Sequence, residues 1–117
     1  MRALITGAAG QDGTILSTML ARQGAQVVGL VKPATDYQQL LRYVPDIQIT
    51  EVDLSDTDAL RHVVKEAAPT HIWNFGGFTA PGESWDHQDE VRRINVDAVE
   101  ALLSCAAELT SPAKVFQ

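Results

Sequence analysis

The sequence lacks the features that mark several large classes of protein: it has few cysteines, few basic residues and no long apolar run. Among its 117 residues there is one cysteine, Cys105, so an internal disulfide is excluded and a reducing, cytoplasmic compartment is expected. Nine Lys and Arg residues stand against fifteen Asp and Glu residues, which disfavours binding to nucleic acid or to a membrane surface through basic clusters. No apolar run approaches the roughly 18 residues of a membrane-spanning helix. The three histidines lack metal-ligand spacing, so no metal site is expected.

What is present is the pattern of one soluble α/β domain over residues 1–117, in which short apolar segments alternate with longer amphipathic ones. The apolar segments, which we predict to be strands, are 2–6, 26–31, 47–52, 71–75 and 114–117. The amphipathic segments, which we predict to be helices, are 14–23, 36–43, a segment from 55 to before 69, and 91–109. This alternation predicts a doubly wound parallel sheet of about five strands, ordered 3-2-1-4-5, with helices on both faces.

Three of these helices carry specific expectations. Ser55 is expected to cap the third helix, because it stands three residues before an acid. The third helix should bury a stripe made of Leu60, Val63, Val64 and Ala67. In the first helix, Ile15, Leu16, Met19 and Leu20 share one face. Cys105 falls on the apolar face of the last helix, which predicts a core residue.

The most informative chemical feature is the stretch Thr6-Gly7-Ala8-Ala9-Gly10-Gln11-Asp12-Gly13, between the first predicted strand and the first predicted helix. Glycines there allow a sharp turn and a close approach of the backbone to a pyrophosphate, and the helix that follows presents free N–H groups to the phosphates. The spacing differs from G-x-G-x-x-G, and no Gly-Lys-Ser/Thr follows. The position of the loop after a predicted strand and before a predicted helix, within a βαβ unit, nevertheless predicts dinucleotide binding. The alternative is that the glycines only make a tight turn in an α/β domain that binds no dinucleotide.

A lysine stands where dinucleotide-binding sheets commonly carry an acid. An Asp or Glu at the end of the second strand accepts the ribose hydroxyls of NAD, whereas this chain has Val31-Lys32-Pro33 and reaches Asp36 only four residues after Lys32. A cation at this point attracts a 2′-phosphate. We therefore predict NADP as the cofactor, with NAD less favoured. The alternative is that Lys32 is a solvated loop residue.

The glycine spacing of this loop resembles that of the extended short-chain dehydrogenases/reductases, whose domain is of the Rossmann type. Within that superfamily, Gly10-Gln11-Asp12-Gly13 is similar to the loop of the GDP-mannose 4,6-dehydratases, and the resemblance covers essentially the whole chain. It implies that Asp53 and Leu54 contact adenine, that the stretch after the fourth strand lies along the cofactor, and that Ser84 lies near the substrate. The candidate cofactor-binding residues are Gly7, Gly10, Gln11, Asp12, Gly13, Lys32, Asp53, Leu54, Phe75, Gly76 and Gly77, and the candidate substrate-binding residue is Ser84.

The resemblance implies the conversion of GDP-mannose to GDP-4-keto-6-deoxymannose by an enzyme with bound NADP. The superfamily's Tyr-x-x-x-Lys pair does not occur here, since Tyr37 and Tyr43 are followed four residues later by Leu41 and Ile47. No catalytic residue is therefore predicted within the chain, which we expect to be the N-terminal half of a longer enzyme. The alternatives are a nucleotide-sugar epimerase or 4-reductase, or a non-catalytic NADP-binding module. A homo-oligomer is a further possibility that the resemblance raises, with helix 91–109 as its contact face.

Overall fold

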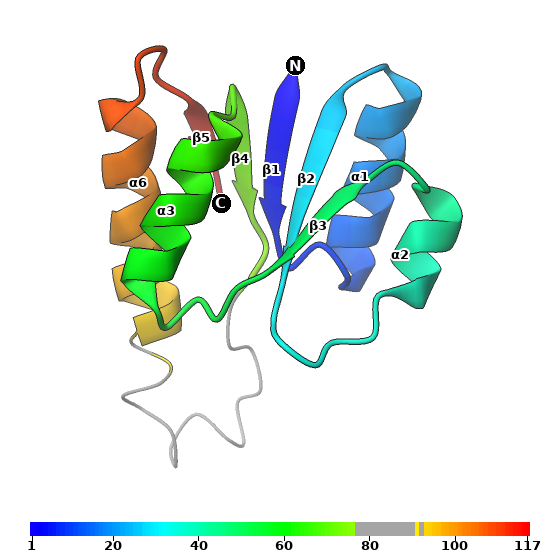
Figure 1. The fold of residues 1–117 in the computed structure, drawn as a ribbon, viewed down its shortest axis with the longest axis horizontal. Coiled ribbons are helices and arrows are strands. Elements are labelled where there is room, and N and C mark those ends of the chain that lie inside the picture. The colour runs from blue at the N-terminus through cyan, green and yellow to red at the C-terminus, as the bar shows by residue number, and fades with distance from the viewer. Residues whose placement is uncertain (77–90, 92) are drawn as a thin grey trace.

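A computed structural model describes residues 1–76, 91 and 93–117 of the chain, and within them the strands form one parallel sheet (Figure 1). The five strands are β1 (Arg2–Thr6), β2 (Gln26–Val31), β3 (Gln48–Glu51), β4 (His71–Asn74) and β5 (Lys114–Phe116). Their order across the sheet is β3-β2-β1-β4-β5, which confirms the predicted fold class and strand order. The direction of winding reverses between β1 and β4, and ligands of doubly wound sheets bind at the carboxyl ends of the strands beside such a point.

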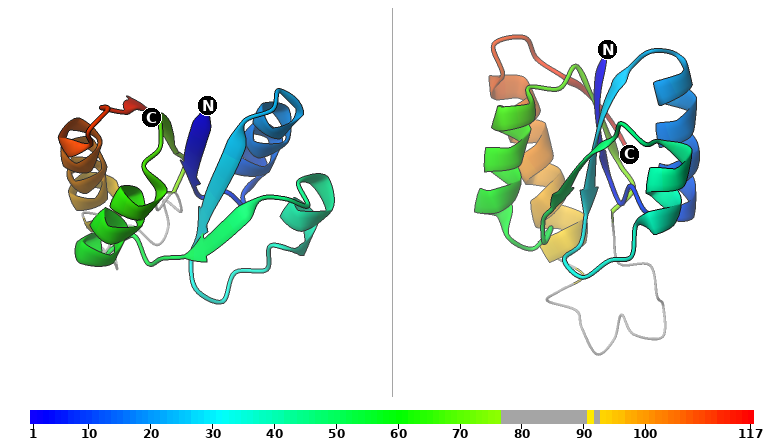
Figure 2. Two further views of the ribbon diagram at one scale, coloured as in Figure 1. Left: turned by 45° about the horizontal axis from the view of Figure 1, so that its top comes forward. Right: turned by 45° about the vertical axis from the view of Figure 1, so that its right-hand side comes forward.

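The helices lie in two layers, one on each face of the sheet (Figure 2). They are α1 (Gln11–Arg22), α2 (Gln38–Tyr43), α3 (Thr57–Ala67) and α6 (Ala98–Glu108), and a π-helical turn, Arg93–Asp97, leads into α6. α1 and α2 cover one face and α3 and α6 the other (Figures 1 and 2). None of the helices in the described residues is long and apolar enough to cross a lipid bilayer.

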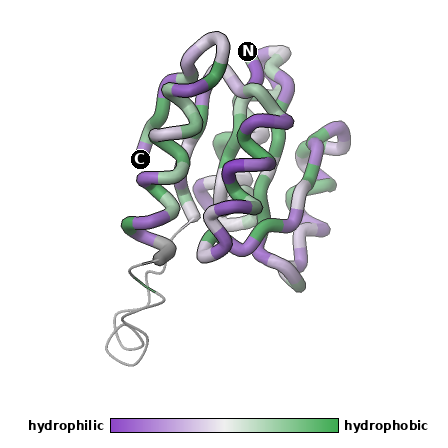
Figure 3. Tube along the Cα trace, turned by 60° about the vertical axis from the view of Figure 1, so that its left-hand side comes forward, coloured by the Kyte–Doolittle hydropathy of each residue, from purple (hydrophilic) through white to green (hydrophobic). Residues whose placement is uncertain are grey.

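The two-layer arrangement follows from the alternation of side chains along the strands. In β1, Ala3 and Ile5 belong to the buried cluster beneath α1 and α2, whereas Leu4 belongs to the cluster that includes Leu60 of α3 and Leu102 of α6. All three β1 side chains are fully buried, as expected for a central strand of a parallel sheet with both faces covered. Figure 3 shows that polar and apolar residues also alternate along the helices, as expected for helices that pack one side on the sheet and expose the other.

Helix α1 differs from its prediction in both its start and its buried face. It begins at Gln11, three residues earlier than expected, so Gln11, Asp12 and Gly13 belong to the helix rather than to the loop before it. Its buried residues are Gly13, Ser17 and Leu20. Of the four residues predicted to share a face, Leu20 is 7% exposed and Leu16 packs partly buried against the same cluster, whereas Ile15 and Met19 are 53% and 54% exposed. Two of the three buried residues, Gly13 and Ser17, are small because Gly13 brings the helix close to the glycine loop.

Helix α3 is capped by a different residue from the one predicted. Asp56 is its N-cap, and the Asp56 side chain accepts a hydrogen bond from the N–H of Ala59 at 3.1 Å. Ser55 instead donates to Asp53, so the prediction that Ser55 caps α3 is wrong. The expected stripe is confirmed: Leu60, Val64 and Ala67 are buried and Val63 packs against the same cluster. Cys105 is 1% exposed on α6, as predicted for a core residue.

Candidate functional site

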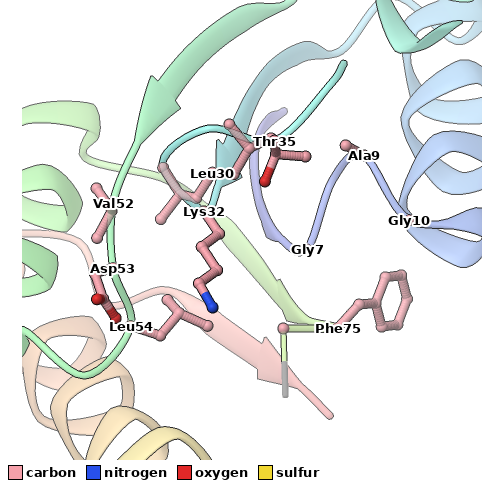
Figure 4. Close-up of a pocket in the computed structure, with 12 residues that line it drawn as sticks. Gly7, Ala9, Gly10, Leu30, Lys32, Thr35, Val52, Asp53, Leu54 and Phe75 are labelled. Atoms are coloured by element: carbon pink, nitrogen blue, oxygen red, sulfur yellow. The ribbon is translucent and has the colours of Figure 1, made fainter. Parts of the chain in front are cut away.

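A groove of about 390 Å³ lies at the carboxyl ends of β1, β2, β3 and β4, within the range of about 300–1,000 Å³ usual for small-molecule sites (Figure 4). Its lining residues are Gly7, Ala9, Gly10, Leu30, Val31, Lys32, Thr35, Val52, Asp53, Leu54, Phe75 and Gly76. They come from four separate connections of the chain, and the sheet brings them together where the winding reverses. We call this the carboxyl-end groove.

The glycine loop forms one wall of the groove, and its backbone packs directly on the loop that follows β4. Gly7 has a φ of +64°, and a Cβ there would lie 2.8 Å from the carbonyl carbon of Phe75 and 2.8 Å from the nitrogen of Gly76. Gly7 therefore meets two requirements that other residues fail, a left-handed backbone and a contact without a side chain. The Ala8 N–H donates to the Leu30 carbonyl at 3.2 Å, which ties the loop to β2 as well.

Helix α1 starts at the edge of the groove. Its N-cap is Gly10, which has no side chain with which to cap the helix, and the N–H of Gly10 donates to the Gly7 carbonyl at 3.1 Å. A Cβ on Gly13 would overlap that same Gly7 carbonyl oxygen. The first turn of α1 thus lies directly on the glycine loop. A helix N-terminus in this position offers backbone N–H groups and the positive end of the helix dipole to an anion.

Lys32 enters the groove from a tight turn after β2. The Lys32 carbonyl accepts a hydrogen bond from the N–H of Thr35 at 3.1 Å, and Ala34 within the turn has a left-handed φ of 68°. Non-glycine residues seldom adopt this conformation, and such strain is often found at functional sites. Figure 4 shows the Lys32 side chain extending across the groove towards Leu54, with the Thr35 side chain near the base of the lysine and away from its ammonium group. The turn therefore contributes an ammonium and a hydroxyl to the lining of the groove.

The carboxylate of Asp53 lies on the side of the groove formed by the end of β3. The Ser55 N–H and hydroxyl both donate to Asp53 Oδ1, at 3.0 and 2.8 Å. These two bonds, and to a smaller extent the positive charge of Lys32, hold the pKa of Asp53 below its ordinary value. Asp53 is therefore ionised at neutral pH and offers an acceptor to hydroxyl groups.

A buried hydrogen-bond network holds the end of β4 in place. The Thr6 hydroxyl donates to Asn74 Oδ1 at 2.5 Å and accepts from the Gly76 N–H at 2.9 Å. The Phe75 N–H donates to the Thr6 carbonyl at 3.3 Å. Thr6 and Asn74 are 0% and 7% exposed, so both depend on these partners. The backbone beside the glycine loop is thus fixed from β1.

The structure brings most of the predicted site residues together. The carboxyl-end groove includes the predicted residues Gly7, Gly10, Lys32, Asp53, Leu54, Phe75 and Gly76. Gln11 lines a neighbouring groove between α1 and α2, Asp12 is exposed in the first turn of α1, and Gly13 is buried beneath it. Gly77 and Ser84 lie outside the described residues.

Some lining residues were missed by the sequence analysis. They are Ala9, Leu30, Val31, Thr35 and Val52. Leu30, Val31 and Val52 stand next to predicted strand ends, so the predicted strand order alone contained the signal that could have found them. Thr35 enters through the turn after Lys32, and the sequence holds no comparable signal for it.

A parallel sheet wound in this order, with a glycine loop between its first strand and first helix, defines a Rossmann-type domain. The sequence profile of the family described as GDP-mannose 4,6 dehydratase matches residues 4–117. The chain belongs to this family.

Known relatives agree with that assignment. GDP-mannose 4,6-dehydratase of Yersinia enterocolitica serotype O:8 is 32% identical over 110 residues, which are 86% of this chain and 29% of the relative. UDP-glucose 4-epimerase of Thermus thermophilus, solved in complex with NAD, superposes with a TM-score of 0.83 at 25% identity, over 98% of this chain and 36% of the epimerase. The Bordetella bronchiseptica enzyme WbmG, solved with NAD and UDP, gives a TM-score of 0.78 at 25% identity, over 93% and 34% of the two chains. The chain thus spans about a third of the length of these proteins.

Proposed function

We propose that residues 1–117 form the cofactor-binding part of a nucleotide-sugar 4,6-dehydratase that acts on GDP-mannose and binds NADP. The observation that carries the proposal is the carboxyl-end groove, in which the glycine loop, Lys32 and the Asp53-Leu54 pair meet at the point where the sheet changes its winding. Membership of the GDP-mannose 4,6-dehydratase family supports the substrate. The single, buried Cys105 supports a reducing, cytoplasmic compartment.

The residues of the groove fit a dinucleotide. Added Cβ atoms at Gly7 and Gly13 would fill the space in which the glycine loop, α1 and the end of β4 meet, so the backbone there is bare by necessity. The first turn of α1 would hold the pyrophosphate through its N–H groups, and Gly7 and Gly10 would let the backbone come close to it. Asp53 and Leu54 would lie beside the adenosine, and Phe75, Gly76 and Gly77 would follow the dinucleotide along its length.

The preference for NADP rests on Lys32, whose ammonium would pair with the 2′-phosphate. The Thr35 hydroxyl, from the same turn, would donate to it. The NAD in the Thermus and Bordetella complexes favours NAD instead, and Asp53 would serve as an acceptor for the hydroxyls of that cofactor. Titration separates these two assignments.

When bound, the nicotinamide supplies a hydride acceptor and donor. The part of this chain in that chemistry is to bind and orient the dinucleotide, and we place the acid–base groups of the reaction in other parts of the enzyme. Assembly with further copies of the chain, through the helix that contains Cys105, is part of the same proposal. An epimerase remains the second candidate, because the Thermus structure that superposes on this chain is a UDP-glucose 4-epimerase.

The cofactor assignment is tested by titrating NADP and NAD into the wild-type protein, Lys32→Met and Lys65→Met. Lys65 is an exposed lysine of α3 outside the groove, so it controls for the loss of one positive charge. We expect the wild type to bind NADP at least tenfold more tightly than NAD. Lys32→Met should weaken NADP about tenfold and NAD little, as expected for the loss of one charge-assisted bond. Tighter binding of NAD by the wild type would overturn the NADP assignment.

The reaction is tested by incubating the protein that carries this chain with GDP-mannose and analysing the sugar product. A 4-keto-6-deoxy sugar nucleotide supports the dehydratase. An epimerised hexose in its place would support the epimerase, and an unchanged substrate together with measurable dinucleotide binding would support a non-catalytic module.

A further inference from the structure

We infer that Gly76 determines the depth of the adenosine half of the carboxyl-end groove. Because Gly76 has no side chain, the Leu54 side chain can pack beside it and stays out of the part of the groove that the ligand would occupy. This inference rests on the proposed binding of a dinucleotide. The pyrophosphate would lie at Gly7 and Gly10, and the ribose phosphate at Lys32. Leu54, which Figure 4 shows beneath the Lys32 side chain, therefore lies on the adenosine side.

The contact between Gly76 and Leu54 leaves no space for even one additional carbon atom. A Cβ on Gly76 would overlap Leu54 Cδ1, and it would lie 3.1 Å from Thr6 Oγ1 and 3.3 Å from Thr6 Cβ. The Leu54 methyl group therefore occupies the position that an alanine side chain at residue 76 would need. The two residues form a complementary pair across the gap between the ends of β3 and β4.

The Gly76 backbone cannot withdraw to relieve such an overlap. Its N–H donates to Thr6 Oγ1 at 2.9 Å, and the preceding N–H, of Phe75, donates to the Thr6 carbonyl. Thr6 is fully buried and is itself bonded to Asn74. A displacement of Gly76 would break bonds of buried groups, which costs more than moving the end of a flexible side chain.

The Leu54 side chain is therefore the part that moves, and its surroundings leave one direction open. On one side it packs against a cluster of fully or nearly fully buried residues that includes Val52 and Leu60. Protein cores are close-packed and resist the entry of a methyl group. On the other side is the groove, which both Leu54 and Gly76 line. With alanine at residue 76, the Leu54 methyl groups would enter the groove and occupy part of its adenosine half.

The test is a double-mutant cycle made of the wild type, Gly76→Ala, Leu54→Ala and the double variant, with binding measured for NADP and for 2′,5′-ADP, which lacks the nicotinamide half. We expect Gly76→Ala to weaken both ligands about tenfold, because both contain the adenosine half. Leu54→Ala removes a side chain that lines the groove, so its own loss of affinity for both ligands is the reference for the double variant. The double variant should bind within about threefold of Leu54→Ala, because the shortened side chain no longer reaches residue 76. Gly24→Ala is the control for binding, since residue 24 does not line the groove; because its φ is +86°, alanine there should cost stability but not affinity.

The unfolding free energy of the same four proteins without ligand tests the packing alone. Gly76→Ala should destabilise the protein more when Leu54 is present than when Leu54 is replaced by alanine. The inference is also supported if Gly76→Ala alone fails to fold while the double variant folds.

An equal loss of affinity from Gly76→Ala in both backgrounds, with Leu54 and with Ala at residue 54, would overturn the inference, as would a loss of affinity for NADP but not for 2′,5′-ADP. Failure of both Gly76 variants to fold would also overturn it, since Thr6 would then be the limiting contact. A wild type that binds neither NADP nor NAD would refute the proposed function, whereas the coupling in unfolding would still decide whether Leu54 and Gly76 pack as a pair.

Discussion

Thr6 and Asn74, 68 positions apart in the sequence, are joined by a buried hydrogen bond in which Thr6 Oγ1 donates to Asn74 Oδ1 at 2.5 Å. The same Thr6 oxygen accepts the N–H of Gly76. β1 and β4 are neighbours in the sheet although α1, β2, α2, β3 and α3 separate them in sequence. One hydroxyl group thus links the two strands whose ends flank the change of winding, and it fixes the wall of the groove on which the glycine loop rests.

Replacement of that hydroxyl by a methyl group tests the role of the link. Thr6→Val keeps the shape of the side chain but leaves a buried amide oxygen of Asn74 and the N–H of Gly76 without their partner. Each buried group left unsatisfied costs about 1–3 kcal/mol, so we expect a loss of about 2 kcal/mol or more in the free energy of unfolding by urea.

Thr6→Ser is the matched control, because it keeps the hydroxyl and removes one methyl group. We expect it to lose about 1 kcal/mol, the contribution of one buried carbon. A larger loss for Thr6→Ser than for Thr6→Val would mean that the methyl group of Thr6 rather than its hydrogen bonds determines the stability here.

The glycines of the loop differ in how closely they are packed. A Cβ on Gly13 would overlap the Gly7 carbonyl oxygen and lie 2.7 Å from Ala8 Cα, whereas a Cβ on Gly10 would meet only the Gly7 oxygen, at 3.3 Å. We expect Gly13→Ala to lose about 3 kcal/mol, because the atoms it meets are backbone and cannot move aside. Gly10→Ala should lose about 1 kcal/mol or less. Urea unfolding of both variants measures the difference, and equal losses would contradict the close contact of α1 with the loop.

The strand order could be predicted because it follows from simple rules that this sequence obeys. Strands and helices alternate without interruption, and the hydropathy of each segment matches its position in a sheet covered on both faces. The glycine loop then indicated the end of β1 as the binding edge. What the pattern could not show was the rotation of α1. Ile15 and Met19 have the right spacing for a buried face, but the close approach at Gly13 turns Gly13, Ser17 and Leu20 towards the sheet instead.

Local hydrogen bonds were harder to predict than the sheet. Ser55 and Asp56 are both good capping residues and stand next to each other, so the sequence alone did not distinguish them. The distinction comes from Asp53, whose carboxylate takes both donors of Ser55 and leaves Asp56 to cap the helix. The pair Leu54 and Gly76 was equally hidden, because its two members are distant in sequence and meet only through the sheet.

The capping assignment leads to a test with two variants. Asp56→Ala removes the acceptor of the Ala59 N–H and should lower the free energy of unfolding by about 1 kcal/mol, the usual contribution of an N-cap side chain. Asp56→Asn keeps an acceptor and should recover most of this loss. Ser55→Ala leaves the cap in place and should cost less than half as much. A larger loss for Ser55→Ala than for Asp56→Ala would return the cap to Ser55.

The carboxyl group of Asp53 gives a prediction about pH. Its pKa is lowered from 3.8 chiefly by the two hydrogen bonds from Ser55, with a smaller contribution from Lys32. Because the folded-state pKa lies below the unfolded value, these contacts stabilise the folded protein above pH 3.8, and that stabilisation is lost as the pH falls through the lower folded-state pKa. Ser55→Ala removes the hydroxyl donor and keeps the N–H donor, so the pKa of Asp53 should rise part of the way towards 3.8.

A carbon-13 NMR titration of the Asp53 carboxyl group measures this change directly. Lys32→Met should raise the same pKa by a smaller amount than Ser55→Ala, since the charge of Lys32 is the weaker of the two lowering causes. Ser104→Ala, at an exposed position of α6, is the matched serine control and should leave the titration unchanged. A larger shift from Lys32→Met than from Ser55→Ala would mean that the ammonium approaches the carboxylate more closely than the Ser55 hydroxyl does. Asp53 and Lys32 would then form an ion pair across the groove, in competition with any phosphate that Lys32 is proposed to bind.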